Sequence, residues 1–332
     1  MDKPKILHLV DDVTPGGVMR VLDHMTRSAT LGEYAEHHHQ RIAPTQVRFD
    51  IGQADLIVSH LSLNWRNFLS RTHLRACHPN LPMVHVEHSY TQAFTAHNVH
   101  HKPRFYAMLR SAFGLFDHVV AVSDAQRDWM LNRRFTSPKK LTAIPSAVDL
   151  ADFAKLPPPA RPATRFGLIG RLHICKGFDL AIEAFMSCEN CRLRLEVFGD
   201  GPERSALEAL ASSDPRITFH GHSNDPLAPM RSVDAVLMPS RWESYGLVAQ
   251  EALAAGRKVL ASHVDGLKSQ EPDGVHLVPD YSATTWRQHI ETLAQLPSIP
   301  YNDADVPHLE RILPNGRFER SWNQLFQKLL SQ

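Results

Sequence analysis

The chain has 332 residues, of which 43% are hydrophobic and 21% charged, a composition that excludes disordered and fibrous proteins. Its formal net charge of +1 argues against a nucleic-acid partner, because nucleic-acid-binding proteins carry a strongly basic face. The length exceeds what one hydrophobic core usually holds and therefore predicts two domains.

The first half of the chain alternates short apolar runs with amphipathic stretches. Strands are predicted at residues 6–10, 56–60, 83–86, 118–123 and 141–144. Helices are predicted at residues 18–28, 65–71, 105–116 and 124–132. Such alternation predicts a mostly parallel sheet covered by helices. The first apolar run is too short for a secretory leader, so we expect a cytoplasmic protein.

A proline-rich segment at residues 156–163 separates the halves, because proline can extend neither a helix nor a sheet. We predict a first domain at 1–155, a linker at 156–163 and a second domain at 164–316. In the second half, strands are predicted at 166–169, 192–198, 217–220, 235–238, 258–261 and 275–278, and helices at 178–186, 202–212 and 246–255. Residues 317–332 are predicted to form an amphipathic helix, for which the first domain is a candidate surface.

The four cysteines cannot form a disulfide framework in a chain of this length, which favours a reducing compartment. Cys188 and Cys191 form a lone C-x-x-C pair without a second pair at zinc-ribbon spacing. We interpret all four as free thiols. Most of the 21 histidines and an excess of basic residues lie in the first half, which would suit an anionic acceptor there.

The most informative segment spans residues 239–256, where an apolar strand is followed by a polar loop and a helix beginning near Gly246. The start of a helix offers unpaired N–H groups and a positive dipole end, and a glycine there lets a diphosphate approach the backbone. Glu243 and Glu251 would lie on either side of that anion and could accept hydrogen bonds from hydroxyl groups. A sugar nucleotide carries a sugar, a diphosphate and a ribose in this order.

A second segment places two cations, Arg171 and Lys176, on a glycine-bounded loop after a strand. Two cations at this spacing can converge on one diphosphate and stabilise the charge that grows on a leaving group. The alternative interpretation is that both are solvated surface charges.

Residues 239–256 resemble the E-x7-E signature of retaining glycosyltransferases of family 4, and residues 167–177 resemble that family's G-R-L-x-x-x-K-G loop. The resemblance implies an α/β protein of the GT-B fold, with two Rossmann-like, doubly wound domains facing across a cleft. It implies transfer of a sugar from a nucleotide-diphosphate donor, UDP- or GDP-linked, to a glycan or lipid-linked acceptor, with retention and with no cofactor or metal. The implied catalytic residues are His88, Arg171, Lys176 and Glu243. The implied donor-binding residues are Gly16, Gly17, Arg171, Lys176, Gly199, His220, Ser244, Tyr245, Gly246, Leu247 and Glu251.

Parts of this assignment leave alternatives open. His85 and Glu87 compete with His88 at the end of the same predicted strand, and the glycines at 16 and 17 could simply form a tight turn. Tyr245 stands where the family often has phenylalanine. The family's G-G-x-x-E segment is replaced after Asp265, which puts one donor-sugar contact in doubt.

Other functions compete with sugar transfer. A sugar-nucleotide epimerase or hydrolase on the same fold would consume the donor without an acceptor. A non-catalytic donor-binding subunit would bind nucleotide tightly without turnover. Residues 97–116, which combine basic and aromatic side chains, leave a peripheral contact with an anionic membrane surface open.

Overall fold

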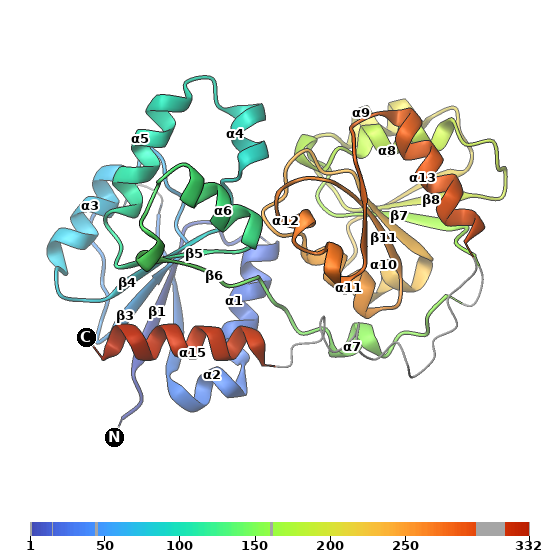
Figure 1. The fold of residues 1–332 in the computed structure, drawn as a ribbon. Helices are drawn as coiled ribbons and strands as arrows, with labels where there is room; N and C mark the ends of the chain where they lie inside the picture. The colour runs from blue at the N-terminus through green and yellow to red at the C-terminus, as the bar shows by residue number, and fades with distance from the viewer. Residues whose placement is uncertain (1, 15, 44–45, 160–161, 297–315, 332) are drawn as a thin grey trace. The chain divides into compact units, whose positions relative to one another are not determined.

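The computed structural model describes residues 2–14, 16–43, 46–159, 162–296 and 316–331 (Figure 1). The chain divides into two compact units. Unit 1 comprises Met1–Val148 with Gly316–Gln332, and unit 2 comprises Asp149–Asn315. Among the described residues, no helix combines the length and apolarity that crossing a membrane requires.

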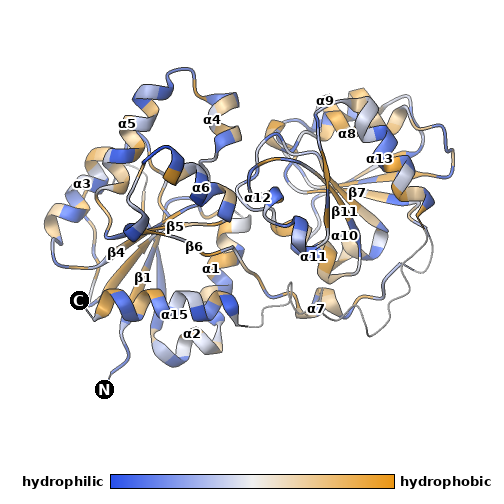
Figure 2. Ribbon diagram, in the orientation of Figure 1, coloured by the Kyte–Doolittle hydropathy of each residue, from blue (hydrophilic) through white to orange (hydrophobic). Residues whose placement is uncertain are grey.

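Unit 1 contains a six-stranded parallel sheet in the order β2-β1-β3-β4-β5-β6. Its strands are β1 (Lys5–Val10), β2 (Glu36–Arg41), β3 (Leu56–Ser59), β4 (Met83–Glu87), β5 (His118–Ala121) and β6 (Leu141–Ala143). Every residue of β3, β4 and β5 is buried, as expected of central parallel strands covered on both faces. Figure 2 shows hydrophobic colours along the central strands and mixed colours on the helices.

The helices of unit 1 are α1 (Gly17–Arg27), α2 (Ala29–Tyr34), α3 (Phe68–Cys77), α4 (Gln92–Asn98), α5 (Lys102–Phe113), α6 (Asp124–Asn132) and α15 (Arg317–Leu330). The C-terminal α15 packs on this unit through a buried face that includes Trp322 and Phe326. Nε2 of His24 in α1 lies 3.1 Å from Oε1 of Glu319 in α15, so a polar contact accompanies the apolar ones. Burial of two large aromatic side chains stabilises this docking by several kcal/mol, at about 1.5–3 kcal/mol each.

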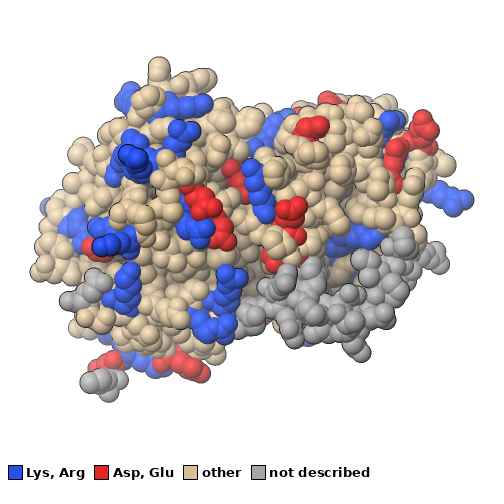
Figure 3. All heavy atoms as spheres, viewed as in Figure 1, with Lys and Arg blue, Asp and Glu red and all other residues tan. Residues whose placement is uncertain are grey.

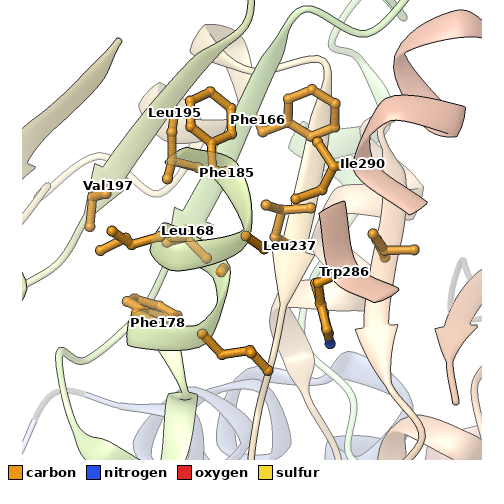
Figure 4. Close-up of a cluster of buried hydrophobic side chains, with 14 of the residues drawn as sticks. Phe166, Leu168, Phe178, Phe185, Leu195, Val197, Leu237, Trp286 and Ile290 are labelled. Carbon is orange, nitrogen blue, oxygen red and sulfur yellow. The ribbon is translucent and has the colours of Figure 1, made fainter. Parts of the chain in front are cut away.

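Unit 2 contains a second six-stranded parallel sheet, in the order β12-β11-β10-β7-β8-β9. Its strands are β7 (Arg165–Ile169), β8 (Arg194–Phe198), β9 (Ile217–Gly221), β10 (Ala235–Met238), β11 (Lys258–Ser262) and β12 (Val275–Val278). Its helices are α7 (Ala151–Ala154), α8 (Phe178–Met186), α9 (Arg204–Ala211), α10 (Leu227–Ser232), α11 (Leu247–Ala254), α12 (Asp265–Lys268) and α13 (Ala283–Gln295). Figure 4 shows its core, where Phe166 and Leu168 of β7 lie among Phe185 of α8 and Trp286 and Ile290 of α13.

All predicted strands are present, and the two parallel sheets covered by helices confirm the α/β class. Edge strand β2 was not predicted because its sequence, Glu-His-His-His-Gln-Arg, is polar at every position. Helix α13 was also missed, although Trp286, Ile290 and Leu293 have helical spacing. The helix predicted at 65–71 begins at Phe68 and continues to Cys77.

Candidate active site

The loops that carry the predicted donor-site residues of the second half lie at the carboxyl ends of the unit 2 strands. All six strands of the sheet are parallel, so their carboxyl ends lie on the same side, where ligands of such sheets bind. The backbone N–H of Gly170 donates to the carbonyl oxygen of Phe198 at 3.0 Å. A Cβ on Gly199, where φ is +138°, would lie 1.8 Å from the carbonyl oxygen of Gly170. Glycine at 199 therefore permits the close approach of the loops after β7 and β8.

Lys176 and Glu243 form an ion pair at the carboxyl ends of the unit 2 strands. The Lys176 ammonium donates to Oε2 of Glu243, and the Ser240 hydroxyl donates to the same oxygen at 3.3 Å. Burial alone would lower the pKa of Lys176, but the adjacent Glu243 carboxylate outweighs it and the pKa is raised. Lys176 is therefore a fixed cation at neutral pH, as an anion-binding role requires.

Arg241 connects the loop that carries Glu243 to the segment that carries Lys176. Its guanidinium donates to both carboxylate oxygens of Asp179, at 2.9 and 2.6 Å, and its backbone N–H donates to the carbonyl oxygen of Cys175 at 2.7 Å. Such bidentate pairs fix geometry as well as charge. The sequence analysis missed Arg241, because a charged residue in a polar loop gives no signal of its partner.

Helix α11 begins immediately after the Glu243 loop. Gly246, its N-cap, has φ of +96°, a left-handed conformation that favours glycine, and a Cβ there would lie 2.7 Å from a methyl carbon of Leu267. Glu251 lies inside the helix with 3% of its surface exposed. The backbone of Gly246 and the carboxylate of Glu251, both parts of the predicted donor site, therefore have positions that helix α11 sets.

The side-chain amides of two buried glutamines support the loop between Glu243 and Gly246. Gln250 donates through Nε2 to the side-chain oxygen of Gln270 at 2.9 Å, and Gln270 donates to the carbonyl oxygen of Tyr245 at 2.5 Å. Both glutamines lie in segments that the sequence singled out, but no role was predicted for either, because their partners are distant in the sequence. Through Gln270 they hold the backbone of Tyr245 and Gly246.

The segment that departs from the family pattern also supports this loop. The N–H of Gly266 donates to the carbonyl oxygen of Glu243 at 2.9 Å, and a Cβ on Gly266 would lie 2.1 Å from the carbonyl oxygen of Ser244. Residues 265–268 form the short helix α12, so the unusual sequence is compatible with an ordered contact.

We expect Gly266→Ala to destabilise unit 2 by about 1–3 kcal/mol, because backbone must move to accept the added methyl group. Urea unfolding measures this loss, and nucleotide-sugar binding should weaken with it as the Glu243 loop shifts. Gly32→Ala is the control, because Gly32 is helical and a Cβ there meets no atom of the described residues within 4 Å, so a small gain in stability is expected. Equal stability of both variants would contradict the support that we assign to Gly266.

Arg171 and His220 have other surroundings. Arg171 is exposed and makes no ion pair within the described part of the chain, but it acts electrostatically on Cys175, as Lys176 and Glu243 do. The His220 ring stacks on Phe198 at 4.4 Å, and its Nε2 lies 2.6 Å from Oε2 of Glu196. Direct donor contacts by both residues remain predictions.

In unit 1, Gly16 is the N-cap of α1 and Gly17 is its first residue. Gly16 has φ of −179°, an extended conformation open to any residue, and among the described residues a Cβ there would meet only the carbonyl oxygen of Thr14, at 3.7 Å. Backbone strain therefore gives no reason for glycine at 16, and the predicted donor contact remains a prediction.

The structure separates the three candidates at the end of β4. The His85 ring stacks on Phe116 at 5.0 Å and is buried. Glu87 accepts hydrogen bonds through Oε1 from the backbone N–H groups of Ser89 and Tyr90, at 2.8 and 2.9 Å, so its carboxylate shapes the turn. The Nε2 atom of His88 lies 2.8 Å from Nδ1 of His60, and the catalytic role of His88 remains a prediction. Burial lowers the pKa of His88 to about 4, which leaves a neutral imidazole near pH 7.

Comparison with known proteins places the chain in a family. The family model described as glycosyl transferases group 1 matches residues 163–295, and that described as Glycosyltransferase Family 4 matches residues 18–152. Together with two parallel α/β units, these matches define the class, and the chain belongs to the family 4 glycosyltransferases of the GT-B fold.

Particular relatives are more distant. A D-inositol 3-phosphate glycosyltransferase of Kineococcus radiotolerans is 30% identical over 219 residues, which make up 55% of this chain and 50% of that protein. One from Actinosynnema mirum is 26% identical over 288 residues, or 76% of this chain and 67% of that protein. The matched part thus spans about half to two thirds of these relatives.

Solved structures show the same fold. Anabaena HepE, in complex with UDP and glucose, is 18% identical with a TM-score of 0.68, and the match covers 99% of this chain and 100% of that one. Sucrose-phosphate synthase from Thermosynechococcus elongatus is 18% identical with a TM-score of 0.72 and the same coverage of both chains. At these identities the likeness concerns the fold alone.

Proposed function

We propose that this protein transfers a sugar from a nucleotide-diphosphate donor, UDP- or GDP-linked, to a glycan or lipid-linked acceptor. The observation that carries the proposal is the Lys176–Glu243 ion pair beside the glycine-started helix α11. A cation and a helix N-terminus that lie together at the carboxyl ends of the strands can bind an anion. A carboxylate beside them can accept hydrogen bonds from sugar hydroxyls. HepE, of the same fold, is described with UDP and glucose bound.

In the proposed reaction the bond between the anomeric carbon and the diphosphate breaks, and an acceptor oxygen bonds to that carbon. Negative charge grows on the departing diphosphate, where Lys176, Arg171 and the start of α11 stabilise it. We propose that these protein cations act without a metal and that configuration is retained, with a donor phosphate oxygen taking the acceptor proton. Positioning of the two substrates supplies the rest of the rate enhancement.

Glu251 is proposed to hold the ribose hydroxyls. We expect Glu251→Gln to raise the Kd of UDP-glucose or GDP-mannose roughly tenfold, because a neutral amide oxygen accepts a weaker hydrogen bond than a carboxylate. Isothermal titration calorimetry against both donors measures the change and identifies the base. Glu208→Gln is the matched control, since Glu208 lies on the surface of α9 and pairs with Arg204. Unchanged affinity in the Glu251 variant would remove this residue from the donor site.

A transfer assay tests the proposed function as a whole. The protein should release nucleoside diphosphate from one nucleotide sugar, and an acceptor should speed the release. Donor consumption that no acceptor changes would favour a hydrolase or epimerase instead. Tight binding with no turnover would favour a donor-binding subunit.

The apolar side chains that the sequence indicated for a membrane contact, Met108 and Leu109, are not available at the surface, but two others are. Met108 and Leu109 of α5 are buried, whereas Trp65 and Leu69, 47% and 78% exposed, lie at the surface, with Arg104 6.0 Å above the Trp65 ring. Figure 3 shows Lys and Arg side chains gathered over the region of α5. We propose that these apolar and basic groups together contact an anionic bilayer.

We expect Leu69→Ser to reduce binding to phosphatidylglycerol vesicles severalfold, since an exposed leucine inserted into lipid contributes about 1–2 kcal/mol. Vesicle co-sedimentation measures the loss. Leu296→Ser makes the same change at a 42%-exposed leucine of unit 2 and should leave vesicle binding unchanged. Absence of wild-type binding to anionic vesicles would refute the membrane contact.

A further inference from the structure

Four histidines of unit 1 form a continuous row of hydrogen-bonded imidazoles that ends at His88. His37 Nδ1 lies 3.0 Å from His8 Nε2, His8 Nδ1 lies 3.0 Å from His60 Nε2, and His60 Nδ1 lies 2.8 Å from His88 Nε2. The members come from β2, β1 and the ends of β3 and β4, which are consecutive in the sheet. We call His37, His8, His60 and His88 the histidine row.

The row is built from neutral rings. His8 and His60 are 0% and 7% exposed, and burial lowers the pKa of every member, to about 4 for His37 and His88. A neutral imidazole has one N–H donor and one bare nitrogen acceptor. Two bare nitrogens, or two N–H groups, cannot face each other at 3.0 Å without repulsion.

All three hydrogen bonds therefore exist together in only two arrangements. In one arrangement every ring is protonated on Nδ1, and His88 presents an N–H group while Nε2 of His37 is bare. In the other every ring is protonated on Nε2, and His88 presents a bare Nδ1 while His37 carries an unpaired N–H. The tautomer at one end of the row is thus fixed by the tautomer at the other.

The surroundings of both ends favour the first arrangement. Nε2 of His37 is buried without a hydrogen-bond partner among the described residues, and its ring lies 5.7 Å from the Phe326 ring of α15. An orphaned buried N–H is rarer in proteins than an under-satisfied acceptor, so a bare nitrogen belongs there. At the other end the Glu87 carboxylate acts electrostatically on His88, and its negative charge favours the N–H end of the row.

We propose that the histidine row holds His88 as the Nδ1–H tautomer, so that this N–H donates a hydrogen bond to an oxygen of the transferred sugar. His60, His8 and His37 are positioning residues that act through His88. The proposal rests on the proposed function for the identity of the ligand, whereas the tautomers can be measured without any ligand. It defines the ligand atom opposite His88 as a hydrogen-bond acceptor.

Long-range ¹H–¹⁵N correlation spectra of the full chain, labelled with ¹⁵N-histidine, report the tautomers directly at pH 7. Single variants of each member assign the signals. We expect all four rings to be protonated on Nδ1 and bare on Nε2. A ring of the row that is protonated on Nε2, or charged, overturns the proposal.

His37→Asp tests the coupling along the row. A carboxylate can only accept, so it should require an N–H on Nε2 of His8 and reverse the tautomers of His8, His60 and His88. We expect the Kd of UDP-glucose to rise roughly tenfold while the Kd of UDP is unchanged, because only the sugar loses a donor. His100→Asp places the same charge on an exposed position of unit 1 that does not act on the row, and it should change neither tautomers nor affinity.

The outcomes separate this inference from the proposed function. Reversed tautomers with unchanged UDP-glucose affinity would overturn the role assigned to the His88 N–H. Tautomers that stay as in the wild type in His37→Asp would overturn the coupling. Failure of the wild-type protein to bind UDP-glucose and GDP-mannose would refute the proposed donor site and would leave the measured tautomers as they are.

Discussion

Lys176→Ala is expected to lower turnover of the nucleotide sugar by about 10²–10³-fold, measured as release of the nucleoside diphosphate. The side chain is a fixed cation beside Glu243 at the carboxyl edge of the second sheet, where the diphosphate is proposed to lie. Its charge should interact more strongly with the departing diphosphate than with the intact donor, because the negative charge grows during the reaction. The loss should therefore fall mainly on kcat.

The same substitution also removes the partner of a mostly buried carboxylate. The Glu243 side chain is 13% exposed, and without its cation unit 2 should lose about 1–3 kcal/mol of stability. Urea unfolding must therefore accompany the kinetics. Lys155→Ala is the control, because Lys155 pairs with Asp152 at the surface with both side chains more than 70% exposed. A folded Lys176→Ala variant with wild-type kcat would refute the site.

Lys176→Arg adds a second measurement that separates charge from geometry. Arginine keeps the positive charge but delivers it from a larger planar group. We expect partial recovery of kcat relative to Lys176→Ala if charge stabilisation dominates. Equal activity of the arginine and alanine variants would mean that the compact ammonium, placed by Glu243, is required.

The parallel strands and the donor motifs could be predicted because each depends on nearby residues. A buried strand such as β10 is an apolar run between polar turns, and the segment from Glu243 to Glu251 is one loop and one helix. The sequence pattern therefore contains both the element and the spacing of its functional groups.

The supporting contacts could not be predicted because they join distant segments. Arg241 meets Asp179, and Gln270 meets the backbone of Tyr245, across separations of 62 and 25 residues. The histidine row is a stronger case: its members come from four strands, and β2 was not predicted at all. Single-sequence patterns identify faces of elements, whereas the register between strands decides which imidazoles touch.

Acidification should lower the free energy of unfolding of unit 1 more than that of unit 2, because the buried histidines of unit 1 take up protons only when they unfold. An unfolded histidine has a pKa near 6.5, and burial lowers that of folded His88 to about 4. Between these values the unfolded chain binds more protons, so the free energy of unfolding falls as pH falls from about 6.5 to about 4. His88 alone accounts for about 3 kcal/mol, and above pH 7 these groups add no further dependence.

Hydrogen exchange detected by mass spectrometry measures the loss of stability for each strand, once the pH dependence of the intrinsic exchange rates has been corrected for. Protection of β1, β3 and β4 should fall between pH 6.5 and 4.5, whereas β7 and β10 of unit 2 serve as internal controls. The groups that face the row are His38, His39 and His85, which lower the pKa of its members, and Glu87, which opposes burial at His88. His88→Gln should reduce the slope, and substitution of exposed His100 by glutamine should not. Equal acid sensitivity of both units would mean that the row is charged or hydrated in the folded protein.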